Sequence, residues 1–200
     1  MGYSTLAKNY KMAKLIVSMM VSLDGFIEGP NKELDWHVFD DEMEAFMLKF
    51  FDGIGTLLFG RVNYQLMEQY WPSGNAKDDQ PRIAAFMNEL PKIVYSKTLT
   101  DVQWQNARLG AKDIRTEVEE LKKESAKNLV VFGGANIVHH LIDLNLIDEF
   151  QMIINPIILG GGTPFFKEPT KMAKLDLISS RQMACGNVVL TYRYKKEPEI

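Results

Sequence analysis

Apolar residues in this chain form short continuous runs, and most runs are followed by a segment in which apolar positions recur every three or four residues. The runs are rich in β-branched residues, as is typical of strands buried on both faces of a sheet. The spaced positions are typical of helices that pack one side against such a sheet. The runs, which predict strands, are residues 14–23, 55–59, 92–95 and 129–132.

The last third of the chain has a different pattern. Residues 149–159 predict a long strand with Pro156 inside it, which fits an edge, a bulge or a strand end. Residues 172–183 and 188–194 flank a turn and predict a terminal hairpin. The three glycines at 160–162 are followed by no helical pattern, so we expect a flexible connection there. The whole predicts an α/β fold with a mostly parallel central sheet, an antiparallel C-terminal edge hairpin and helices on both faces.

Residues 128–142 are the most informative stretch, because an apolar strand runs into Gly133 and Gly134 and then into a helix. Glycines allow close backbone approach, and the free N–H groups of a helix start attract anions. A nucleotide pyrophosphate is the natural ligand of such a turn. The alternative is a simple turn between two core elements, since the fuller dinucleotide fingerprint has three glycines.

A second strand ends in Gly60 and is followed by Arg61 at the start of a helix. A cation in the first turn opposes the helix dipole, so this arginine is either a solvated side chain or a ligand for phosphate. A third strand ends next to Ser96 and Lys97, which again place a hydroxyl and a cation at a carboxyl end.

Carboxylates follow the first strand. Asp24 precedes Gly25 at the strand end, where it either stands at the mouth of a cleft or forms a simple turn. Four of the residues 40–44 are acidic, and they begin a helix, as the dipole favours. Glu42 and Phe46 share one face of that helix, and Trp36 lies just upstream.

Composition narrows the classes of function. The 200 residues are 46% hydrophobic and 24% charged, which indicates one soluble domain. The net charge of -3 argues against nucleic acid and acidic membranes as partners, and no apolar run is long enough to span a bilayer. We therefore expect a cytoplasmic protein. Residues 1–13 are expected to form a disordered extension, 14–195 the folded domain and 196–200 a tail.

Cysteine and histidine are scarce. Cys185 stands alone, which excludes an internal disulfide and a cysteine-based metal site. His139 and His140 are adjacent and cannot share a helix face, so we expect no bound metal.

The order of these motifs resembles the dihydrofolate reductase superfamily, in particular the branch of the C-terminal reductase domain of the bifunctional riboflavin-biosynthesis deaminase/reductase. The resemblance covers roughly residues 14–194. Two positions depart from the family pattern, with Asn63 where Thr is frequent and Ala135 where a third glycine is frequent. The matching pieces are Val21-Ser-Leu-Asp-Gly25, Leu34-Asp-Trp36, Leu58-Phe-Gly-Arg61 with Tyr64, Tyr95-Ser-Lys97, Val131-Phe-Gly-Gly134, Leu146-Ile-Asp-Glu149 and Pro156-Ile-Ile-Leu-Gly-Gly-Gly162.

The resemblance implies a dihydrofolate-reductase-like three-layer fold that binds NADPH across the carboxyl ends of the sheet. It implies that Arg61, Ser96 and Lys97 hold the adenosine 2′-phosphate, and that Ser22, Leu23 and Asp24 lie near the nicotinamide. The residues that it assigns to the pyrophosphate turn and to the neighbouring cofactor surface are Gly133, Gly134, Ala135, Asn136, Ile137 and Gly60.

The implied activity is reduction of a small pterin- or pyrimidinone-like heterocycle, of the dihydrofolate reductase or 5-amino-6-ribosylaminouracil reductase type. Asp24 and Glu42 are the candidate proton donors, with Asp41 as a third. Trp36, Phe46 and Asn155 are expected at the substrate. The riboflavin-pathway substrate carries a ribose phosphate, for which the sequence shows no second basic cluster.

Two further expectations accompany the resemblance. The chain is expected to form a homodimer through its terminal strands. The alternative to an enzyme is a non-catalytic NADP- or nucleotide-binding module of the same fold, which keeps the cleft but lacks a proton donor.

Overall fold

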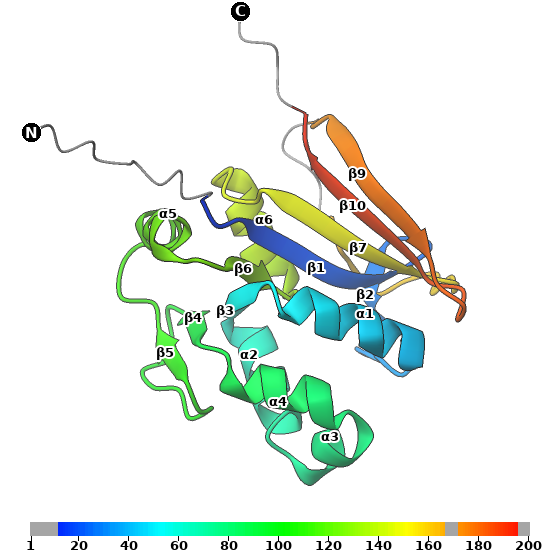
Figure 1. Cartoon of the computed structure of the whole chain (residues 1–200), viewed down its shortest axis with the longest axis horizontal. Helices are drawn as coiled ribbons and strands as arrows, with labels where there is room; N and C mark the ends of the chain where they lie inside the picture. The colour runs from blue at the N-terminus through cyan, green and yellow to red at the C-terminus, as the bar shows by residue number, and fades with distance from the viewer. Residues whose placement is uncertain (1–11, 167–171, 196–200) are drawn as a thin grey trace, which may run out of the picture.

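A computed structural model describes residues 12–166 and 172–195, and its centre is an eight-stranded sheet of order β5-β4-β3-β6-β1-β7-β10-β9 (Figure 1). The first six strands of that order are parallel to one another, and the last two are antiparallel to their neighbours. The strands are β1 Leu15–Ser22, β3 Ile54–Gly60, β4 Lys92–Tyr95, β5 Ala107–Leu109, β6 Asn128–Val131, β7 Glu149–Asn155, β9 Leu175–Gln182 and β10 Val188–Tyr194.

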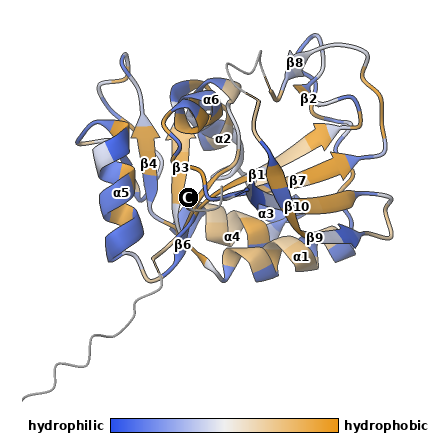
Figure 2. Ribbon diagram, turned by 90° about the horizontal axis from the view of Figure 1, so that it is seen from above, coloured by the Kyte–Doolittle hydropathy of each residue, from blue (hydrophilic) through white to orange (hydrophobic). Residues whose placement is uncertain are grey.

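Helices cover both faces of this sheet (Figure 1). Successive residues of β1 face opposite sides, so Leu15 and Val17 pack in one core cluster, with α5 and α6, while Ile16 packs in the other, with α1 and α4. Figure 2 shows the strands between these helices as the most hydrophobic part of the molecule. The predicted α/β architecture is confirmed. The helices are α1 Asp41–Phe51, α2 Arg61–Tyr70, α3 Gly74–Asp79, α4 Pro81–Glu89, α5 Ile114–Glu124 and α6 Ala135–Asp143.

Two predicted boundaries differ from the structure near the C-terminal half. The strand expected at 149–159 ends at Asn155, because Pro156 lacks the N–H that a further ladder bond requires. The glycine run at 160–162 is not a free connection, since it leads into β8 (Thr163–Pro164), which pairs with β2 (Phe26–Glu28). Gly162 has φ +129, and a Cβ there would lie 2.0 Å from the carbonyl oxygen of Glu28. The close approach of the Gly162 and Glu28 backbones therefore requires glycine at position 162.

A short helix follows α2. Residues 76–79, a polar stretch of the sequence, belong to α3, whose N-cap Ser73 accepts a hydrogen bond from the Ala76 amide at 3.4 Å. The cap satisfies one of the amides that a helix start leaves open. This short helix packs against α4.

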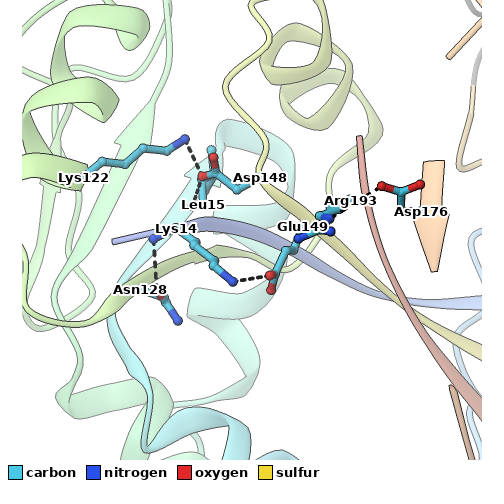
Figure 3. Close-up of polar contacts among 8 residues, drawn as sticks. All are labelled: Lys14, Leu15, Lys122, Asn128, Asp148, Glu149, Asp176 and Arg193. Carbon is cyan, nitrogen blue, oxygen red and sulfur yellow. Dashed lines mark hydrogen bonds and ion pairs between the residues drawn. The ribbon is translucent and has the colours of Figure 1, made fainter. Parts of the chain in front are cut away.

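A polar network fastens the amino ends of the central strands, on the edge of the sheet away from the carboxyl ends (Figure 3). The Leu15 amide donates to the Asp148 carboxylate at 2.7 Å, and Lys122 Nζ lies 2.5 Å from the same carboxylate. The Lys14 amide donates to Asn128 Oδ1 at 2.9 Å, and its ammonium pairs with Glu149. Side chains thus complete the pairing where β1 enters the sheet.

The ordered fold already includes the residue before the predicted boundary at 14. Ala13 is buried, and its amide donates to the carbonyl oxygen of Lys122 at 2.9 Å. The expected extension at residues 1–11 and tail at 196–200 lie outside the described residues. Within the described residues, every helix is too short or too polar to cross a membrane.

Candidate functional site

A cavity of about 1700 Å³ opens at the carboxyl ends of the parallel strands. Its wall includes Met19 and Met20 of β1, Gly60 at the end of β3, Ser96 after β4 and Gly134 after β6. Single small-molecule sites usually occupy about 300–1,000 Å³. The cavity is therefore large enough for a dinucleotide together with a second, smaller molecule.

The starts of α2 and α6 meet at this cavity. Strands β3 and β6 are parallel neighbours, so the helices that follow them begin side by side. A Cβ on Gly60 would lie 3.1 Å from Ile137 Cβ, and one on Gly134 would lie 3.2 Å from Asn63 Cβ. Two helix starts that are far apart in sequence are thus in contact.

Both helix starts lack the features that usually neutralise them. Side chains cap α1, α3 and α5, through Asp40, Ser73 and Asp113. In α2 and α6 the N-caps are Gly60 and Gly134, with no side-chain cap and no acidic residue in the first turn. Two helix dipoles therefore face the cavity with partial positive charge, which favours an anion.

Cations stand beside these helix starts. The guanidinium of Arg61 donates to Gln65 at 3.3 Å, and neither it nor Lys97 forms an ion pair within the described part of the chain. Lys112 and Arg115 also line the cavity, but each pairs with a carboxylate of α5. Within the described residues, Arg61 and Lys97 are thus cations beside the helix starts without a carboxylate partner, and Lys32, elsewhere in the cavity wall, also lacks one.

Most of the predicted cofactor residues come together. The exceptions are Ser22, Leu23 and Gly133, which are not part of the cavity wall. Ser22 is buried, and its hydroxyl accepts from the Phe26 amide at 2.9 Å, while the Leu23 amide donates to Ile157 at 2.8 Å. The predicted residues in the wall are Gly60, Arg61, Ser96, Lys97, Gly134, Ala135, Asn136 and Ile137.

Gly133 lies directly behind that wall. Its φ is +102, a value that L side chains rarely adopt, and a Cβ there would lie 2.6 Å from the Met19 sulfur. Because Met19 lines the cavity, the glycine allows this side chain to pack on the turn between β6 and α6.

Asp24 is held outside the cavity wall. Its carboxylate accepts hydrogen bonds from the amides of Leu159 (3.1 Å) and Gly160 (2.8 Å). Hydrogen bonding from Ser22, and then from these two amides, lowers the pKa of Asp24. The ionised carboxylate ties the end of β1 to the glycine run that precedes β8.

Glu42 and Phe46 also lie outside the wall. Glu42 accepts from the Ala184 amide at 2.7 Å and from Arg181 at 2.8 Å, and these two contacts lower its pKa. The Arg181 guanidinium stands over the Phe46 ring, 5.7 Å from its centroid. The pair fastens α1 to the β9–β10 hairpin, and Asp41 is not in the wall either.

The remaining predicted substrate residues support the loop before α1. Trp36 Nε1 donates to the Glu33 carbonyl oxygen at 2.9 Å. Asn155 is fully buried and accepts from the Val38 amide at 3.0 Å, while Asn187 donates to the Val38 carbonyl oxygen at 2.8 Å. Neither Trp36 nor Asn155 lines the cavity.

The wall also contains polar residues that the sequence analysis did not single out, among them Glu28, Lys32 and His37. Glu28 Oε1 accepts from the Thr163 hydroxyl at 2.6 Å, across the β2–β8 pair. Burial lowers the pKa of His37 to about 4, so the ring is neutral at pH 7. No local pattern marks Glu28, because its position depends on pairing with a strand that lies far along the chain.

Comparison with known proteins identifies the family of this chain. The model of the RibD C-terminal domain family matches residues 13–189. The uncharacterized protein YyaP of Bacillus subtilis (strain 168) is 32% identical over 189 residues, which cover 94% of this chain and 99% of that protein.

Solved structures share the fold. A putative riboflavin biosynthesis protein from Shewanella sp. PV-4 has a TM-score of 0.74 at 23% identity, covering 92% of this chain and 99% of that one. Dihydrofolate reductase from Enterococcus faecalis, complexed with NADP(H), has a TM-score of 0.62 at 18% identity, covering 92% and 97%. The predicted dihydrofolate-reductase-like fold is confirmed.

Proposed function

Because the chain belongs to the RibD C-terminal domain family, we propose that it is an NADPH-dependent reductase that transfers a hydride to a small pterin- or pyrimidinone-like heterocycle. One observation carries the proposal: two uncapped helix starts and the unpaired cations Arg61 and Lys97 meet in one cavity. That arrangement matches a ligand with several phosphates.

The residues divide between the phosphates of the cofactor. The start of α6, from Gly134 to Asn136 with Ile137 beside it, binds the pyrophosphate, and Gly60 leaves room for it at the start of α2. Arg61, with Ser96 and Lys97, binds the adenosine 2′-phosphate, since a guanidinium fork matches phosphate oxygens. Ser22 and Leu23, which do not line the cavity themselves, lie near the nicotinamide at the end of β1, and Gly133 supports Met19 beside it.

The bound nicotinamide supplies the hydride. Reduction of a C=N or C=O bond also requires a proton at the heteroatom, from a side chain or an ordered water. Asp24 and Glu42 stay candidates for this role, although both carboxylates are engaged by amides outside the cavity wall. Support for NADP(H) as the cofactor comes from the bound state of the Enterococcus faecalis neighbour.

Cofactor selectivity tests the assignment. Arg61→Ala is expected to weaken NADPH binding by about 1.5–3 kcal/mol, the usual range for hydrogen bonds to charged groups, while NADH binding hardly changes. Calorimetry measures both. Arg193→Ala is the matched control, because Arg193 is an exposed arginine of β10 that pairs only loosely with Asp176, at 3.8 Å.

If Arg61→Ala weakened NADPH and NADH binding equally, Arg61 would not bind the 2′-phosphate. Absence of NADPH binding to the wild-type protein at millimolar concentration would refute the function as a whole.

The engagement of Asp24 and Glu42 favours a second candidate, a non-catalytic NADP- or nucleotide-binding module. It predicts NADPH binding without NADPH oxidation. Oxidation of NADPH with dihydrofolate or a pyrimidinone, followed at 340 nm and abolished in Asp24→Asn or Glu42→Gln, would exclude it.

A further inference from the structure

The cavity extends along the whole length of α2. Its wall includes Arg61, the first residue of this helix, and Tyr70, the last. The helix has 10 residues, and because each adds about 1.5 Å its two ends lie about 15 Å apart. The cavity therefore has a second end, beside the C-terminal half of α2, that is well separated from the cation at the helix start.

Apolar side chains from three helices form the wall at this second end, which we call the α4 end. Six of them belong to one hydrophobic cluster, so they make a continuous surface. Among the described residues of the wall, those from α1, α4 and the C-terminal half of α2 carry no charge. The six side chains are Met47 and Phe51 of α1, Met67 and the C-cap Trp71 of α2, and Ile83 and Met87 of α4.

Helix α2 also presents a partly exposed apolar stripe to the cavity. Val62, Leu66 and Tyr70 recur every four residues, line the cavity and are 58%, 47% and 37% exposed. Side chains four residues apart lie on one face of a helix. A ligand in the cavity would remove this stripe from water, which favours an apolar occupant.

The aromatic part of the α4 end is held in a fixed position. The Trp71 carbonyl oxygen accepts a hydrogen bond from the Asn88 side chain of α4 at 2.9 Å. The Trp71 indole N–H lies 3.0 Å from the Met67 sulfur, and its ring meets the Tyr70 ring edge to face, with 5.0 Å between the centroids. Aromatic groups that are already ordered lose little freedom when a ligand binds.

The α4 end is continuous with the place of the proposed reaction. Met20 of β1 packs against the hydrophobic cluster that contains Ile153 of β7 and the α4 end, and both residues line the cavity. Under the proposed function, the reacting heterocycle lies beside the nicotinamide at the end of β1. A substituent on that heterocycle can therefore extend to the α4 end along one apolar wall.

We infer that the α4 end binds an uncharged aromatic substituent of the substrate, so that the substrate is a heterocycle with an aromatic side group. The inference rests on the proposed function, since that function places the reacting ring. Aromatic rings and methionine sulfur both make favourable contacts with an aromatic group. A charged substituent would be buried there without a partner, at a cost in free energy.

Three probes that share the reducible ring test the substituent. They are 6-methyl-, 6-phenyl- and 6-(4-carboxyphenyl)-7,8-dihydropterin, each titrated by calorimetry into protein saturated with NADP⁺, which prevents turnover. The phenyl probe is expected to bind at least about tenfold more tightly than the methyl probe, because its ring leaves water. The carboxylate should cancel most of this gain.

Equal binding of the methyl and phenyl probes, or binding of none of the three, overturns the inference. Equal binding of the phenyl and carboxyphenyl probes overturns it as well, because the substituent would then lie in solvent rather than at the α4 end.

Substitution in the stripe tests the place of binding. Leu66→Gln keeps the length of the side chain and is expected to reduce the advantage of the phenyl over the methyl probe about 3- to 10-fold. Ile158→Gln is the matched control, because Ile158 is an exposed apolar residue that does not line the cavity. Equal effects of the two substitutions, or no effect of Leu66→Gln, contradict the assignment.

The cofactor itself is the competing occupant. If Leu66→Gln weakened NADP⁺ binding as much as binding of the phenyl probe, the cofactor would occupy the α4 end and the inference would be wrong. Absence of cofactor binding to the wild-type protein refutes the proposed function. Normal cofactor binding without a preference for the phenyl probe refutes only the present inference.

Discussion

At the scale of single residues, the cavity depends on backbone conformations that only glycine adopts easily. Gly133 and Gly134 have φ values of +102 and +83, and Gly133 also admits the Met19 side chain. The sequence predicted the turn, since a glycine pair between strand and helix is a strong local signal. It gave no information on Met19, because the contact joins two strands.

Gly133→Ala is expected to destabilise the protein by about 1–3 kcal/mol, from left-handed strain and overlap with Met19. Urea denaturation measures the change. Gly74→Ala serves as the control, because a Cβ at the start of α3 would meet no atom within 4 Å, and it should leave stability equal or slightly higher. If Gly133→Ala left the free energy of unfolding unchanged, the turn would be able to adjust to the added methyl group without cost.

His37 links stability to pH. Burial lowers its pKa to about 4, whereas in the unfolded chain the pKa is near 6.5. Between these values the unfolded state binds more protons, so stability is full above pH 6.5 and falls as the pH drops towards 4. Between pH 6.5 and pH 4, the free energy of unfolding of the wild type should fall by at most about 3 kcal/mol more than that of His37→Gln, as measured by urea denaturation. If stability depended on pH in the same way in both proteins, burial would not lower the pKa of His37.

At the scale of elements, local patterns identified strands and helices well, but long-range pairing was not visible. The β2–β8 pair and the hairpin contacts of Glu42 join segments more than a hundred residues apart. The sequence analysis therefore named Asp24 and Glu42 as candidate proton donors without their partners, while the structure shows both carboxylates bound to amides. The same pairing brings Glu28 to the cavity.

The polar network at the amino ends of the strands gives a stability prediction. Asp148→Ala leaves the Leu15 amide and the largely buried Lys122 ammonium without their carboxylate, and should cost about 1–3 kcal/mol in urea denaturation. Asp176→Ala removes only the loose, exposed pair with Arg193 and should change stability by less than about 0.5 kcal/mol. Similar costs for both would argue against a structural role for the network.

At the scale of the whole molecule, the order of motifs predicted the fold, and the turns after β3, β4 and β6 do meet at one cavity. That success has a physical basis, since parallel strands bring their carboxyl ends, and the turns after them, to one edge of the sheet. The substrate end was less predictable, because loops from several strands build it and no single segment encodes it.

The expected homodimer belongs to this scale. Strand β9 is the edge of the sheet, and it exposes Leu175, Leu177 and Ile178. An exposed edge with apolar side chains favours pairing with a second copy. Light scattering should give twice the chain mass of 22.8 kDa, and Leu177→Lys should shift the protein towards the single-chain mass. A wild-type monomer would contradict the prediction.

The contact between Gly60 and Ile137 has a mechanical consequence. Two helices that touch at their first residues cannot tilt independently, so this part of the cavity floor behaves as one rigid piece although two distant parts of the chain build it. A substitution that moves α2 will be transmitted to α6, and ligand discrimination there will depend on a fixed spacing rather than on adjustment of the protein.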